Sequence, residues 1–164
     1  MKKFIIIMLF LLVGTGTFII PVQSGFLLTI NEKETVLFVP NKTKEMTVGW
    51  RHSVELTPWE ETYQVIEKGN LSLESTIYMS YGAGTPDTEG VVELLPNGFM
   101  RVTGIERIIP SYSLMYIPIS QYYVKINNKK YILSDFVPEY ENVKIHYKVL
   151  RLHDWIYLKF KGRG

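Results

Sequence analysis

The residues best suited to chemistry in this chain are a histidine and a carboxylate, His52 and Glu61. If residues 46–54 form one strand, His52 shares a face with apolar neighbours and points inward. Glu61 has the same inward parity in the next predicted strand, residues 61–67. A carboxylate removed from water is costly unless it is paired, so we expect the two side chains to lie within hydrogen-bonding or water-bridged reach. Such a pair is either the acid and base of a hydrolase or a structural contact.

A glycine-rich stretch, residues 80–87, is the second candidate, and its distinctive positions are Tyr81, Gly82, Gly84 and Pro86. Its backbone amides could approach an anion, although a tight loop without a ligand has the same composition. It is not a dinucleotide-binding fingerprint, because the third glycine is missing and no helix is expected to follow. We expect this loop to lie beside the histidine–glutamate pair.

Other catalytic chemistry finds little support in the residue types. The chain has no cysteine, which excludes disulfides, thiolate zinc sites and cysteine nucleophiles. His146 falls on a polar strand face and His153 in a turn, so no multi-histidine metal site is expected. Ser53 and Glu55 fall on the strand face opposite to His52 and are expected to be solvated. We therefore expect no metal, no cofactor and no assigned catalytic residue.

Tyrosines are a further feature of the chain, which has 11 of them. They could line a stacking surface, although sheets are rich in aromatic residues whatever their function. The tyrosines concerned include Tyr112, Tyr116, Tyr122, Tyr123 and Tyr131.

The N-terminus has the residue order of an export signal. Two lysines precede an apolar run over residues 4–13, and small residues favour cleavage after Ser24. The alternative is an uncleaved membrane anchor, because residues 4–22 approach the length that spans a bilayer. Both interpretations place residues 25–164 outside the cytoplasmic membrane, whether secreted, periplasmic or held at the cell envelope. Residues 1–24 are thus a hydrophobic signal or anchor helix, and one domain follows.

The charge balance argues against one class of partner. The 164 residues include 18 Lys and Arg against 16 Asp and Glu. Two of these lysines, Lys2 and Lys3, belong to the leader, so the domain that follows is neutral. A nucleic-acid-binding protein needs a basic surface, and we expect none here.

The domain has the pattern of short strands. Apolar and polar residues alternate over residues 71–81 and 143–150, and Pro96-Asn97-Gly98 is a hairpin-turn sequence. This pattern predicts an all-β domain, a β-sandwich or partly closed barrel of about 9–11 short antiparallel strands. Helical turns are expected only within residues 109–119 and 133–138. The predicted strands are residues 26–30, 35–39, 46–54, 61–67, 71–81, 91–95, 99–105, 121–126, 130–134, 143–150 and 155–160.

The order of these pieces resembles a family of small exported bacterial proteins, that of domain of unknown function 1850. The resemblance rests on the hydrophobic leader, on His52-Ser53-Val54-Glu55 followed by Pro58 and Glu61, and on Tyr81-Gly82-Ala83-Gly84-x-Pro86. Members are often encoded beside tripartite ATP-independent periplasmic (TRAP) transporters of the TAXI class. The resemblance implies an extracytoplasmic accessory role in solute uptake and no known activity. It singles out His52, Ser53, Glu55, Glu61, Gly82, Gly84 and Pro86.

Three classes of function remain open from the sequence. The first is a non-enzymatic module that binds a small solute or a TRAP transporter component, such as its substrate-binding protein or permease. The second is a hydrolase that uses His52 and Glu61. The third is a structural protein of the cell envelope, with membrane contact through residues 4–22 if the leader is retained.

Overall fold

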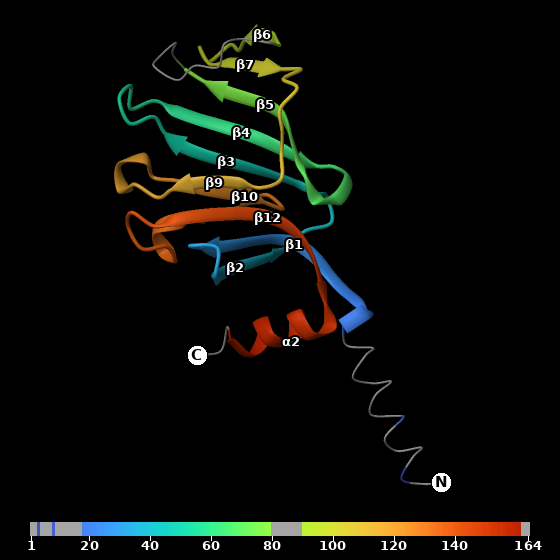
Figure 1. Ribbon diagram of the computed structural model, residues 1–164. Coiled ribbons are helices and arrows are strands. Elements are labelled where there is room, and N and C mark those ends of the chain that lie inside the picture. The colour runs from blue at the N-terminus through green and yellow to red at the C-terminus, as the bar shows by residue number, and fades with distance from the viewer. Residues whose placement is uncertain (1–2, 4–7, 9–17, 80–89, 162–164) are drawn as a thin grey trace.

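The computed structural model describes residues 3, 8, 18–79 and 90–161, and most of these residues lie in antiparallel strands (Figure 1). Twelve strands in this part of the chain form two sheets, and a ten-residue helix, α2 (Leu152–Lys161), follows the last strand. The predicted all-β class is therefore confirmed in its broad form. Three short 3-10 helices join the strands: η1 (Glu67–Gly69), η2 (Pro118–Ser120) and η3 (Leu133–Asp135).

The smaller sheet joins the two ends of the described chain. Its order is β2-β1-β12-β9. The first and last strands are its central pair, and Phe26 lies opposite Tyr147. The strands are β1 (Pro21–Ile30), β2 (Glu34–Pro40), β9 (Tyr112–Met115) and β12 (Asn142–Arg151).

The larger sheet contains the middle of the chain. Its order is β11-β10-β3-β4-β5-β7-β6, and β8 pairs with one end of β5. Its strands are β3 (Glu45–Arg51), β4 (Pro58–Val65), β5 (Leu71–Tyr78), β6 (Val91–Leu94), β7 (Met100–Thr103), β8 (Ile108–Ile109), β10 (Tyr123–Ile126) and β11 (Lys129–Ile132).

One apolar core connects the two sheets. It includes Phe26 and Ile145 from the smaller sheet and Met46, Val48 and Tyr63 from the larger one, all fully buried. Met46, Tyr63 and Ile145 alternate with more exposed neighbours, as the two-residue period of a strand with one buried face requires, whereas β1 is buried on both faces around Phe26. Burying such a side chain stabilises the fold by about 1.5–3 kcal/mol. The inward faces of β3 and β4 are therefore fixed by the core.

The C-terminal segment corrects the sequence prediction. Residues 155–160 were expected to form a strand, but they belong to α2. An alternation only six residues long is also compatible with a helix, and here the apolar side chains that contact the sheet are spaced by three, at Trp155 and Leu158. Asp154 favours the helix because its carboxylate accepts the backbone N–H of Arg151 (3.4 Å) at the first turn.

The stretch from residue 109 to 119 is also more extended than predicted. It contains β9 before the short helix η2, whereas the helical turn expected within residues 133–138 is present as η3. Pro118 at the start of η2 suits the first turn of a helix because proline lacks the backbone N–H that would be unpaired there.

The predicted leader lies mainly outside the described residues. The strand β1 begins at Pro21, and Ser24 lies within it, opposite Val149. The Ser24 carbonyl also accepts the N–H of Asn41 (3.0 Å). No helix within residues 18–79 and 90–161 is both long and apolar enough to cross a bilayer. The division at residue 24 stays a prediction.

Candidate functional site

His52 and Glu61, the predicted pair, do not meet. Glu61 lies opposite Val48 in the β3–β4 ladder, and His52 lies beyond the end of β3, where its N–H donates to the Thr57 carbonyl (2.9 Å). The two residues are thus four positions apart along the hairpin, or about 13 Å at the strand rise of about 3.3 Å per residue. The predicted contact is wrong, and an acid–base pair made of these two groups is not supported.

His52 instead organises a tight turn. The predicted strand over residues 46–54 ends at Arg51, and His52 Nδ1 accepts the N–H groups of Val54 (3.4 Å) and Glu55 (3.1 Å). Its ring stacks against Trp59 with the centroids 5.9 Å apart. Through these contacts the imidazole holds the loop between β3 and β4 in place. Ser53 and Glu55 are exposed, as expected, but Val54 of the opposite parity is exposed as well, because these residues lie in the turn and not in a strand.

Glu61 points inward, as predicted, but its partners are an arginine and a tyrosine. Its side chain is buried, with Oε1 2.6 Å from Arg107 Nη2, and Oε2 accepts the hydroxyl of Tyr63 (2.8 Å). Arg107 Nη2 also donates to the Tyr63 hydroxyl (3.2 Å). The three side chains form a closed cluster in which both carboxylate oxygens are satisfied, as a buried charge requires.

The electrostatics of this cluster suit a structural role. Burial, followed by the negative charge of Glu61, raises the pKa of both Tyr63 and Tyr112 far above neutral. Burial would lower the pKa of Arg107, but the charge of Glu61 outweighs it and raises this pKa. The tyrosines thus stay protonated and the arginine stays charged at physiological pH. A general base needs a pKa near the working pH, and these tyrosines do not have one.

An open groove lies at the end of the larger sheet where the β3–β4 loop, β10, β11 and η2 converge. Its volume is about 640 Å³. We call it the cationic groove, because the charged side chains among its lining residues are Arg51 and Lys130. The residues that give it its character are Trp50, Arg51, Tyr116, Gln121, Tyr123 and Lys130.

A glycine allows the central aromatic ring of the groove to lie flat. Gly49 faces Tyr123 across the β3–β10 ladder, and a Cβ at Gly49 would overlap the Tyr123 ring. The Tyr123 hydroxyl donates to Glu60 Oε1, and the Lys130 ammonium lies over the ring, 3.7 Å from its centroid. The ring thereby positions a cation at the mouth of the groove through a cation–π contact.

A second set of bonds balances the charge beneath the groove. Lys125 Nζ lies 2.6 Å from Glu60 Oε1. Burial raises the pKa of Glu60, but hydrogen bonds from Lys125 and Tyr123 and the charges of Lys125 and Lys130 outweigh it, so the pKa lies below its ordinary value. Glu60 is therefore ionised at neutral pH and largely neutralised by Lys125. Arg51, whose Nε donates to the Ile119 carbonyl (3.1 Å), adds to the positive field of the groove.

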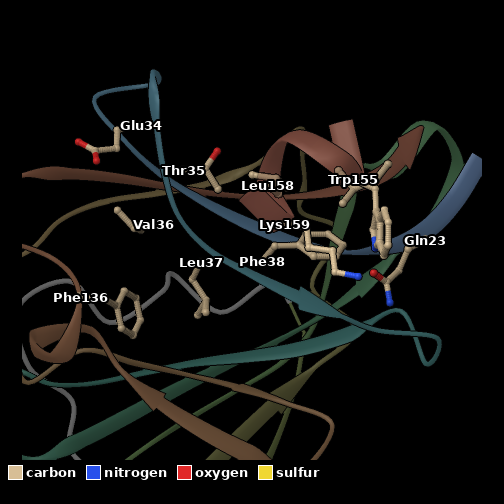
Figure 2. Close-up of a pocket in the computed structure, with 11 residues that line it drawn as sticks. Gln23, Glu34, Thr35, Val36, Leu37, Phe38, Phe136, Trp155, Leu158 and Lys159 are labelled. Carbon is tan, nitrogen blue, oxygen red and sulfur yellow. The ribbon is translucent and has the colours of Figure 1, made fainter. Parts of the chain in front are cut away.

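A separate hollow lies between the open edge of β2 and the helix α2, and we call it the edge groove (Figure 2). Figure 2 shows Gln23, Trp155 and Lys159 at one end and Phe136 at the other. Its volume is about 520 Å³, and its charged lining residues, Glu34 and Lys159, have opposite signs. The edge groove therefore has charges of both signs, whereas the charged lining residues of the cationic groove are all positive.

The remaining predicted positions fall elsewhere. Tyr81, Gly82, Gly84 and Pro86 lie outside the described residues, so their predicted place beside the pair stays a prediction. Within residues 18–79 and 90–161, no cluster of three or more His, Asp or Glu side chains is arranged to bind a metal ion.

Residues 46–133 match the sequence model of a family described as a domain of unknown function (DUF1850). The chain belongs to this family. The matched region includes the Glu61–Arg107 pair and, apart from Ser134, all residues that line the cationic groove. The edge groove lies wholly outside it. No match was found among curated proteins or solved structures.

Proposed function

We propose that this member of the DUF1850 family is a non-enzymatic binding protein that works outside the cytoplasmic membrane. The cationic groove takes a small organic anion with an apolar body. The observation that carries the proposal is the combination in one groove of two cations, Arg51 and Lys130, with the aromatic side chains of Trp50, Tyr116 and Tyr123.

The chemistry of the groove supports this ligand class. An arginine guanidinium binds a carboxylate through parallel hydrogen bonds, and a nearby lysine adds charge. Aromatic walls remove the apolar part of a ligand from water. A volume of about 640 Å³ lies within the range of about 300–1,000 Å³ that is usual for small-molecule sites.

The location and the physiological role rest on the sequence. The basic start and apolar run support export, and the family resemblance implies an accessory role beside a TAXI-class TRAP transporter. Two antiparallel sheets around one core are the architecture of a β-sandwich, which is part of the proposal. The partner is then a TRAP substrate-binding protein or permease that receives or delivers the bound anion.

The ligand test uses isothermal titration of the purified full chain with benzoate, phenylacetate and hexanoate, each against its neutral amide. Binding of at least one acid and of none of the amides is expected. R51Q and K130Q should each weaken binding about tenfold, the loss of one charge-assisted hydrogen bond. K129Q is the matched control, because Lys129 is the neighbouring residue on β11 but is not in the groove and has its ammonium over Tyr131.

Two results would contradict the proposal. Equal binding of acids and amides would show that charge plays no part, and equal weakening by K129Q would place the ligand elsewhere. Absence of binding to all the acids, together with no association with the TRAP proteins encoded by the same genome, would favour a structural role in the envelope.

A further inference from the structure

The helix α2 has two faces with different surroundings. Trp155 and Leu158 are partly buried against the strands and line the edge groove. Ile156, Tyr157 and Phe160 point away from it and are 38%, 63% and 71% exposed. Exposed aromatic and aliphatic side chains that gather on one face of a helix mark a contact surface. We call these three residues the outward face of α2.

This face continues into the last residues of the apolar N-terminal segment. The Phe18 ring contacts the His153 ring in a tilted arrangement with the centroids 4.6 Å apart, and the Phe18 carbonyl accepts a hydrogen bond from Arg151 Nη1 (2.9 Å). The Leu152 N–H donates to the Ile20 carbonyl (3.0 Å) at the start of the helix. Phe18, Ile19 and Ile20 are all more than half exposed. The helix is therefore joined to the segment at its first turn.

The position of α2 in the fold agrees with this junction. Figure 1 shows α2 beside the start of β1, at the end of the molecule opposite β6 and β7. Phe18 and Ile20, at the described end of the apolar N-terminal stretch, contact residues 151–153 at the start of α2. The cationic groove belongs to the larger sheet, whereas α2 contacts β1 and β12 of the smaller one.

Charged side chains flank the outward face of α2. Asp154 pairs with Lys148 (3.3 Å), while Lys159 lies over the Trp155 ring at 4.5 Å and Lys161 ends the helix. Trp and Tyr side chains with nearby Lys are typical of residues that lie at the level of lipid headgroups. A helix with an aromatic face and basic flanks binds anionic lipids in the plane of the interface.

We propose that the outward face of α2 lies in the headgroup region of an anionic membrane, beside the end of the N-terminal apolar segment. The inference rests on the proposed location outside the cytoplasmic membrane and takes the alternative in which residues 4–22 are an uncleaved anchor. The segment holds the domain at the membrane, and α2 fixes its orientation. The ligand-binding end of the larger sheet then has a defined direction relative to the bilayer.

The absence of cysteine allows a direct test by spin labelling of the full chain in phosphatidylglycerol–phosphatidylcholine vesicles. Each variant carries a single label, at Y157C or at F160C. E74C, on the exposed face of β5, is the matched control. Collision of the first two labels with a water-soluble nickel chelate should fall severalfold below the control. Collision with oxygen should rise. Vesicles of phosphatidylcholine alone should give weaker protection.

Three outcomes would overturn the inference. If the chain floats with the vesicles but both labels are as accessible to nickel as the control, α2 is not in the interface, although the proposed location survives. If the chain does not float with the vesicles, the inference and the retained segment fail together. If the two labels show dipolar broadening without lipid, a second copy covers the face instead.

Discussion

Two neighbouring carboxylates on β4 have opposite roles because they lie on opposite faces of one sheet. Glu61 faces the core and is enclosed by Arg107 and Tyr63. Glu60 faces outward and joins Lys125 and Tyr123 below the cationic groove. The side chain of Glu60 is 28% exposed and that of Glu61 is 10% exposed. The same chemical group is thus a buried structural anchor in one case and part of a solvated binding surface in the other.

This difference indicates which face of the larger sheet is suited to ligand binding within the family-matched region. The inner cluster is closed, with hydrogen bonds among its own members. The outer set places cations at an open groove. Substitutions on the inner face should therefore change mainly stability, and substitutions on the outer face should change mainly ligand binding.

The largest effect is expected from R107A. Loss of the guanidinium leaves Glu61 with only the Tyr63 hydroxyl as a partner, which should lower the free energy of unfolding by about 2 kcal/mol. Arg107 is 45% exposed, so water reaches the vacated space and limits the loss. The matched outer variant, K125A, should cost less than about 1 kcal/mol. Urea denaturation measures both, and equal losses would remove the proposed contrast between the two faces.

G49A is the next largest change and acts on the outer face alone. The added methyl group would overlap the Tyr123 ring, so the ring must move, at a cost of about 1–2 kcal/mol by analogy with overpacked sites. Because Tyr123 positions Lys130, ligand affinity should fall along with stability. Thermal unfolding and titration with the anion measure the two effects. Unchanged affinity in a destabilised variant would show that the ring does not organise the groove.

Y123F tests the hydrogen bond without moving the ring. Removal of the hydroxyl that donates to Glu60 should cost about 1 kcal/mol of stability. Lys125 still neutralises the carboxylate, and the cation–π contact with Lys130 remains. Ligand affinity should therefore change little, in contrast to G49A. A loss of affinity as large as that of G49A would instead assign the hydroxyl a direct contact with the ligand.

The smallest effect is a dependence on pH. The lowered pKa of Glu60 means that its ionised form is favoured by folding. Its contribution to stability is present above the ordinary value of 4.5 and is lost as the pH falls through the lower folded-state pKa. The stability difference between wild type and E60Q should shrink as the pH falls from 6 to 3. Chemical denaturation at each pH measures it, and a difference that grows in acid would contradict the assignment.

Local pattern predicted which way the strands face but not what they contact. The alternation along residues 61–67 correctly turned Glu61 inward, because one face of β4 is buried. Its partner Arg107 comes from the loop between β7 and β8, and no periodicity marks a loop residue that folds back onto a strand. His52 was assigned to a strand face, yet β3 ends before it and the histidine takes the backbone donors of a turn.

The cationic groove and the helix α2 show two further limits of prediction from the sequence. Tyr116 and Tyr123 were recognised as candidates for a stacking surface, but Lys130 reaches them only through the β10–β11 hairpin. The six-residue alternation before the C-terminus was too short to separate helix from strand. The contacts of α2 with β1 and β12 and the partial burial of Trp155 accompany the helix, and these are tertiary features that a local pattern does not contain.

The pairing of β1 with β12 sets the timing of folding. Thr29 hydrogen-bonds the Lys144 carbonyl (3.5 Å), 115 positions along the chain. The smaller sheet therefore has no central pair until β12, residues 142–151, has been synthesised. Folds dominated by such distant contacts form in milliseconds to seconds rather than microseconds. The strands of the larger sheet all precede residue 133, so they can pair while the smaller sheet still lacks β12.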